Sequence, residues 1–123
     1  MTEMAEREKM WTQLEERIRK NYEEMKESWE TEFSVSDLIG NAEWIAAAKI
    51  MAENYLYCVS EDTARQLLTL QNPLEALADL WVEQTDNNLF EMQDLIEREI
   101  DHDWLTEYEK YEPEDDTPDM KLG

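Results

Sequence analysis

Apolar residues recur at intervals of three and four along most of this chain, and this spacing places side chains on one face of an α-helix. The first such stretch covers residues 2–32, and the junction that follows, residues 31–41, offers several helix-capping side chains. Residues 42–57 are apolar almost all round, which predicts the central helix of the fold. Another short helix is predicted from Ser60, which can cap it, to Leu70.

The longest apolar stripe belongs to residues 72–104. Asn72 can cap a helix, Pro73 suits the first helical position, and Glu75 follows three residues after the cap. Residues 85–88 contain Asp and Asn, which are weak helix formers and good caps, but the apolar phase carries across them. We therefore favour one continuous or merely bent helix, with two helices in register as the alternative, and expect an acidic outer surface in either case.

These patterns predict an all-α fold, a compact bundle of four or five helices with a central apolar helix and a long acidic C-terminal helix. Only two Gly and three Pro interrupt the 123 residues, which favours helix throughout. We expect one helical domain over residues 1–111 and an acidic flexible tail at 112–123, where nothing apolar is available to bury. The predicted buried residues are Trp44, Ile45, Ala48, Leu67, Leu77, Trp81, Met92 and Ile96.

The net charge of −21 adds information about partners. Residues 73–123 contain seventeen acids and three bases, so a net −14 of that −21 lies in this part of the chain. Such a surface repels phosphates, which disfavours direct binding to nucleic acid or to an anionic membrane and favours a basic protein partner. The alternative is that the charge only keeps the protein in solution.

Two kinds of side chain are candidates for contacting a basic partner. The first are the acids on the outer faces of the predicted last helix. The second are Tyr108 and Tyr111, which lie among acids and suit contacts to Arg and Lys, although packing of the helix end is an equal alternative. The predicted partner-binding residues are Asp79, Glu83, Asp86, Glu91, Asp94, Glu97, Asp101, Asp103, Tyr108 and Tyr111.

No arrangement of residues indicates catalysis, so we expect a protein that is not an enzyme. The one histidine, His102, forms a single Glu-x-x-His with Glu99, whereas a carboxylate-bridged di-metal bundle uses that pair twice. We therefore predict no metal and no cofactor, and interpret both residues as surface residues. Cys58 is interpreted as a small core residue, because nothing cationic lies nearby in the sequence to lower its pKa.

A cytoplasmic location is expected from three features. A single cysteine suits a reducing compartment, the N-terminus lacks the pattern of a signal peptide, and no segment has the length and apolar character of a membrane span.

One segment carries a resemblance to a family. Residues 60–68, SEDTARQLL, followed by Asn72-Pro73-Leu74 and then Trp81, resemble an uncharacterised family of small acidic proteins carried on mobile elements of gut bacteria. The likeness covers roughly residues 37–104. It implies a genomic setting in which small accessory proteins often counter host defence, and it implies no catalytic residues.

Two functional hypotheses remain. The first is a non-enzymatic inhibitor, an anti-CRISPR or anti-restriction protein whose acidic surface mimics nucleic acid and blocks the basic groove of a CRISPR nuclease or restriction enzyme. The second is a helical adaptor or oligomerisation module without such mimicry, whose apolar stripes let it form a homodimer or join a larger assembly. Steep salt dependence of partner binding favours the first hypothesis, and shallow dependence favours the second.

Overall fold

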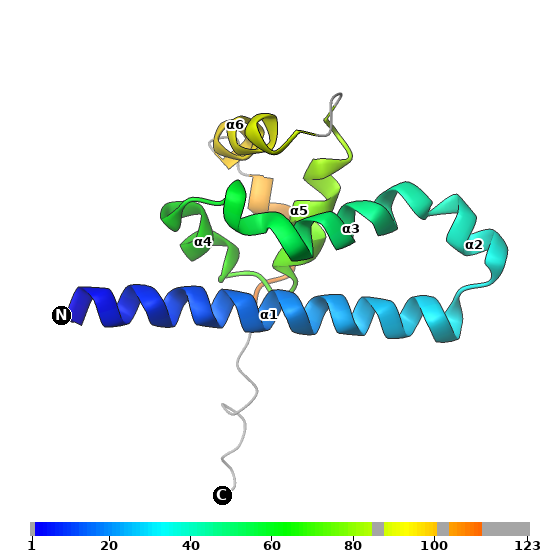
Figure 1. The fold of residues 1–123 in the computed structure, drawn as a ribbon, viewed down its shortest axis with the longest axis horizontal. Coiled ribbons are helices and arrows are strands. Elements are labelled where there is room, and N and C mark those ends of the chain that lie inside the picture. The colour runs from blue at the N-terminus through cyan, green and yellow to red at the C-terminus, as the bar shows by residue number, and fades with distance from the viewer. Residues whose placement is uncertain (1, 85–87, 101–103, 112–123) are drawn as a thin grey trace, which may run out of the picture.

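The computed structural model describes residues 2–84, 88–100 and 104–111, and in these ranges the chain is all-α, as predicted (Figure 1). This part holds six α-helices rather than four or five, because α2 is a separate helix and the stretch 72–104 is divided. The predicted tail at 112–123 lies outside the described residues. In chain order the elements are α1 (Thr2–Glu32), α2 (Val35–Gly40), α3 (Ala42–Asn54), the 3-10 turn η1 (Tyr55–Tyr57), α4 (Glu61–Leu67), α5 (Pro73–Trp81), α6 (Leu89–Ile100) and the 3-10 turn η2 (Trp104–Glu107).

Helix α5 is the centre of the core. Its start is the predicted one, with Pro73 in the first turn and the side chain of Asn72 accepting a hydrogen bond from the backbone N–H of Glu75 at 3.0 Å. Seven of its nine residues are buried, all except Glu75 and Asp79. The helix packs against α3, α1 and α6, so its apolar faces meet a neighbour in three directions.

The prediction that residues 42–57 form one helix buried on nearly every side is wrong, because the α-helix ends at Asn54 and one of its faces is exposed, although α3 does pack against α5 and α1. Helix α3 buries only Ala47, Ala48 and Met51, while Ala46 is exposed. Alanine has the highest intrinsic helix propensity and has no long apolar side chain to cover, so an alanine-rich helix can leave one face in solvent. The alanines made this stretch look apolar all round without burying it on every side.

Most of the predicted core is confirmed. Six of the eight predicted residues are buried, namely Ala48, Leu67, Leu77, Trp81, Met92 and Ile96. The other two, Trp44 and Ile45, are half-buried, since they lie in the first turn of α3 near the edge of the fold.

The predicted continuous or bent helix over residues 72–104 is also wrong, because α5 ends at Trp81. The backbone N–H of Gln84 donates to the carbonyl of Trp81 at 3.1 Å, which closes the helix in a tighter turn. Helix α6 then begins at Leu89, where the side-chain oxygen of Asn88 accepts from the backbone N–H of Phe90 at 2.7 Å. Asn88 therefore caps a new helix instead of extending the old one.

Helix α1 runs along one side of the molecule, with α6 on the opposite side (Figure 1). Its middle part supplies the core contacts through Met10, Leu14, Ile18 and Asn21, all of which are buried. At the C-terminal end of α1 the chain turns through α2 and returns along α3, so α2 forms the corner farthest from the N-terminus (Figure 1).

Candidate functional site

Three of the predicted partner-binding residues come together where α5 ends and α6 runs past it. Glu83, Glu91 and Asp94 line a hollow of about 420 Å³, and Arg98 lies among them. Glu97, three residues after Asp94 on α6, is exposed like the three lining carboxylates. We call Glu83, Glu91, Asp94 and Glu97 the α6 acidic face.

Three of the four carboxylates of this face carry charge that no ion pair among the described residues neutralises. Glu83, Asp94 and Glu97 make no ion pair within ranges 2–84, 88–100 and 104–111. The ion pairs of Arg7 and Arg65 lie elsewhere. They join these two side chains to the acids that begin α4. Asp94 and Glu97 are three positions apart on a helix, so their charges project side by side and produce a fixed negative potential.

Asp79 does not lie on the α6 acidic face, and its predicted place on an exposed acidic surface is wrong. This carboxylate is half-buried. It accepts a hydrogen bond from the indole N–H of Trp44 at 2.6 Å and another from the hydroxyl of Tyr108 at 2.7 Å. Asp79 therefore joins α3, α5 and the segment after η2.

Tyr108 is half-buried in the same cluster, so the prediction that it is exposed among acids is wrong as well. Burial raises the pKa of the Tyr108 hydroxyl, and its hydrogen bond to the carboxylate of Asp79 raises that pKa further. The hydroxyl consequently stays protonated and donates to Asp79 across the physiological range.

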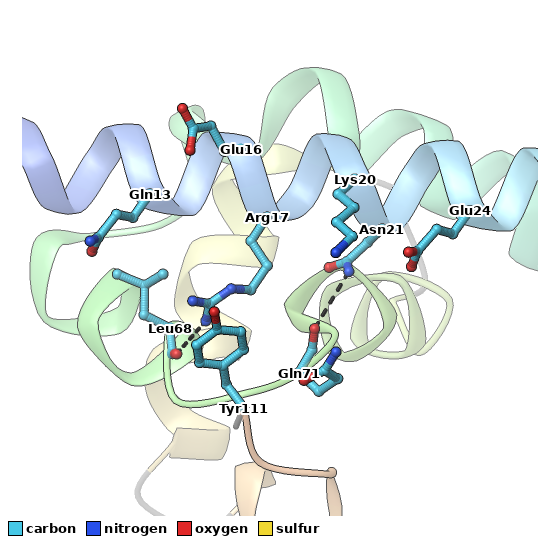
Figure 2. Close-up of a pocket in the computed structure, with 9 residues that line it drawn as sticks. All are labelled: Gln13, Glu16, Arg17, Lys20, Asn21, Glu24, Leu68, Gln71 and Tyr111. Carbon is cyan, nitrogen blue, oxygen red and sulfur yellow. Dashed lines mark hydrogen bonds between the residues drawn. The ribbon is translucent and has the colours of Figure 1, made fainter. Parts of the chain in front are cut away.

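Tyr111 also packs against the protein, although 41% of it remains exposed. The guanidinium of Arg17 on α1 lies 3.7 Å from the centre of the Tyr111 ring. Arg17 also donates a hydrogen bond to the carbonyl of Leu68 (Figure 2) and another to the carbonyl of Leu70 at 3.2 Å. Packing of the helix end, the alternative for both tyrosines, therefore describes Tyr108, whereas Tyr111 is exposed as predicted and also contacts Arg17.

A hollow of about 560 Å³ lies beside this contact, between α1 and the loop that precedes α5 (Figure 2). Arg17, Lys20 and Asn21 line it from α1, and Gln71 and Tyr111 line it from the other side. Asn21 is buried and donates to the carbonyl of Gln71 at 3.5 Å. Two of the polar residues of this hollow, Arg17 and Asn21, thus join α1 to the rest of the fold.

The remaining predicted partner-binding acids, Asp86, Asp101 and Asp103, lie outside the described residues, as does His102. Glu99 is half-buried. Within the part of the chain that the structure describes, no three His, Cys, Asp or Glu side chains gather as ligands for a metal ion.

The interpretation of Cys58 as a core residue is confirmed. Its side chain is buried, and Sγ lies 3.6 Å from the carbonyl oxygen of Tyr55. Burial raises the pKa of the Cys58 thiol to about 12, so the thiol is protonated and a poor nucleophile at neutral pH.

Two features of the surface were missed by the sequence analysis. The first is Arg17, whose partners lie about fifty residues away along the chain. The second is a set of exposed apolar side chains, among them Val35 and Ile39 on α2 and Phe90 on α6. The four-residue spacing of Val35 and Ile39 was the available signal, because it places both on one face of a helix.

Glu75 provides a test of the electrostatics around Asp79. Its pKa is raised by partial burial of the carboxyl group and by the charges of Asp79 and Glu109. The protonated form therefore favours folding, and this contribution is fully present below the ordinary pKa of 4.5 and is lost as pH rises through the higher folded-state pKa. We expect Glu75→Gln to raise the melting temperature at pH 7, with a gain that shrinks as the pH approaches 4.

Glu8→Gln on the exposed side of α1 is the matched control, because it also removes one negative charge. The measurement is thermal unfolding of both variants and the parent across this pH range. A gain from Glu75→Gln no larger than that from Glu8→Gln would contradict the assignment.

Comparison of the chain with protein-family models, with curated proteins and with solved structures found no match. The resemblance of residues 37–104 to a family of mobile-element proteins therefore stays a prediction. In the described ranges, no helix is both long and apolar enough to cross a membrane.

Proposed function

We propose that this protein is a non-enzymatic inhibitor that binds the basic nucleic-acid groove of another protein through its α6 acidic face. The observation that carries the proposal is that Glu83, Asp94 and Glu97 are exposed and make no ion pair among the described residues. Carboxylates held on a helix can accept the charge-assisted hydrogen bonds that Arg and Lys otherwise donate to phosphates.

The overall charge supports the same function. A net charge of −21 on 123 residues attracts a basic groove over a distance and accelerates association, most strongly at low salt. A single exposed ion pair contributes only about 0–1 kcal/mol, so recognition has to be spread over several carboxylates. The α6 acidic face offers three that are exposed and make no ion pair among the described residues, those of Glu83, Asp94 and Glu97.

The proposed partner is a basic nucleic-acid-binding protein of bacterial defence, such as a CRISPR nuclease or a restriction enzyme. This choice rests on the charge of the chain and on the resemblance of residues 37–104. Such enzymes hold their substrate in positively charged channels, which a rigid acidic helix can enter in place of the nucleic acid.

A helical adaptor is the second candidate function. It is favoured by the exposure of Val35 and Ile39 on one face of α2, because neighbouring apolar side chains left in solvent form the kind of patch that binds other proteins. A homodimer is the simplest form of this candidate, although two chains of −21 each repel one another.

The proposal is tested with a variant in which Glu83→Gln, Asp94→Asn and Glu97→Gln remove three charges from the α6 acidic face. The matched control is Glu6→Gln, Glu8→Gln and Glu23→Gln, which removes three charges from exposed positions of α1. Inhibition of purified Cas9-type nucleases and restriction enzymes is measured with both variants and the parent. We expect the face variant to lose inhibitory potency by about tenfold or more, since several interfacial charge pairs are lost together, and the control to retain it.

Raising the salt concentration should weaken inhibition by the parent steeply. If no such enzyme is inhibited, or if the two triple variants inhibit equally, the inhibitor proposal is wrong. Potency that is indifferent to salt would favour the adaptor.

A further inference from the structure

Helix α2 is a six-residue helix without a buried residue. Local hydrogen bonds hold it instead. The hydroxyl of Ser34 accepts from the backbone N–H of Asp37 at 3.1 Å, and the Asp37 carboxylate accepts from the backbone N–H of Ser34 at 3.0 Å. At the other end the side chain of Asn41 donates to the carbonyl of Asp37 at 2.8 Å. These local hydrogen bonds hold α2 as a helix even when no partner contacts its outer face.

That outer face is apolar. Val35 and Ile39 are four positions apart, so they lie on one face of α2, and each is 72% exposed. Gly40 is open to solvent too, because a Cβ atom added there would meet no other atom within 4 Å. Leu38, by contrast, is half-buried. Helix α2 lies at the corner of the fold farthest from the N-terminus (Figure 1), and the exposure of Val35 and Ile39 leaves two branched apolar side chains in solvent there.

The charge around this apolar face is of one sign. Residues 27–43 contain five acids and no Lys or Arg. All five carboxylates, those of Glu27, Glu30, Glu32, Asp37 and Glu43, belong to exposed residues. A second copy of the chain on this corner would bring two such acidic rims together, which like-charge repulsion disfavours. A basic occupant meets no such opposition.

We propose that the α2 corner, formed by Val35 and Ile39 with their rim of Glu32, Asp37 and Glu43, docks a protein segment that carries apolar side chains flanked by Lys or Arg. A basic amphipathic helix has this pattern. Burial of Val35 and Ile39 supplies affinity that salt does not screen, and the acidic rim orients the segment. This surface is separate from the α6 acidic face, which lies at another part of the fold (Figure 1), so the two can contact different parts of one partner.

The test uses the full chain, labelled with ¹⁵N, and two peptides of about 18 residues patterned as helices. One peptide consists of Leu and Lys with the Leu residues on one face, and the other replaces every Leu with Gln at the same charge. Titrations followed by two-dimensional NMR at about 0.15 M salt give the site and the dissociation constant. We expect the Leu/Lys peptide to shift the amides of residues 33–43, and the Gln/Lys peptide to bind there at least about tenfold more weakly.

The double variant Val35→Ser and Ile39→Ser should weaken binding of the Leu/Lys peptide to residues 33–43 by about tenfold or more. Phe90→Ser is the matched control, because Phe90 is also exposed but lies on α6, and it should bind as the parent does. A melting temperature equal to that of the parent verifies that the double variant is folded. We expect this result because neither side chain is buried.

Equal affinity of parent and double variant would overturn the proposal, as would shifts confined to α6. Sedimentation measures whether the chain dimerises. If the parent forms a dimer and the double variant does not, then a second copy of the chain occupies the corner and the proposal is overturned. Each of these results is independent of nuclease inhibition, so the docking corner and the inhibitor proposal can fail separately.

Discussion

Replacing Leu77 with alanine should lower the free energy of unfolding by about 2–5 kcal/mol. Leu77 lies in the middle of α5 and has no exposed surface. Truncation removes apolar atoms from the core and leaves a cavity where α5 meets its neighbours, which can close only partly. A domain of this size has a total stability of only about 5–15 kcal/mol, so the variant should unfold at a clearly lower temperature and denaturant concentration.

Leu56→Ala is the control for this prediction, because it makes the same chemical change at a residue that is 62% exposed. We expect its free energy of unfolding to lie within about 0.5 kcal/mol of the parent value. Urea unfolding followed by circular dichroism measures both variants. Equal midpoints for Leu77→Ala and Leu56→Ala would show that α5 is not the centre of the core.

Replacing Arg17 with methionine should lower the free energy of unfolding by about 2–4 kcal/mol, because two hydrogen bonds from a charged donor and a cation–π contact are lost together. The guanidinium ties α1 to the carbonyls of Leu68 and Leu70 and to the ring of Tyr111. Burial lowers the pKa of Arg17, yet a guanidinium remains charged at every physiological pH. Methionine keeps much of the apolar stem but leaves both carbonyls without this donor.

Arg17→Lys should give an intermediate loss, because an ammonium lacks the planar fork that reaches two carbonyls and stacks on an aromatic ring. Arg19→Met is the control, since Arg19 is exposed on the same helix. The same urea titration measures all three. If Arg17→Met and Arg19→Met are equally stable, then the contacts of Arg17 do not hold α1 in place.

Features encoded within a few residues were predictable from the sequence. The helix starts at Ser34, Ser60 and Asn72 each depend on a side chain that accepts from a backbone N–H three residues later. The apolar stripe of α5 was equally clear, because the helical period alone identifies a buried face.

Features that depend on distant residues were not predictable in this way. Asp79 reads as one acid among many on a helix, but its partners Trp44 and Tyr108 lie 35 and 29 positions away. The apolar phase that continues across residues 85–88 was also misleading. Phase measures only which face a residue would occupy if the helix continued, whereas the cap at Asn88 decides that a new helix begins.

The most direct test of the α6 acidic face is a competition experiment. This protein and duplex DNA compete for a nuclease that the protein has been found to inhibit. The anisotropy of a fluorescent duplex bound to the nuclease is followed as the chain is added, at about 0.05 and 0.2 M salt. We predict that the parent and the α1 control variant displace the DNA completely, less effectively at the higher salt, and that the variant lacking the charges of Glu83, Asp94 and Glu97 does not. A complex in which the DNA stays bound while the chain saturates the nuclease would contradict nucleic-acid mimicry.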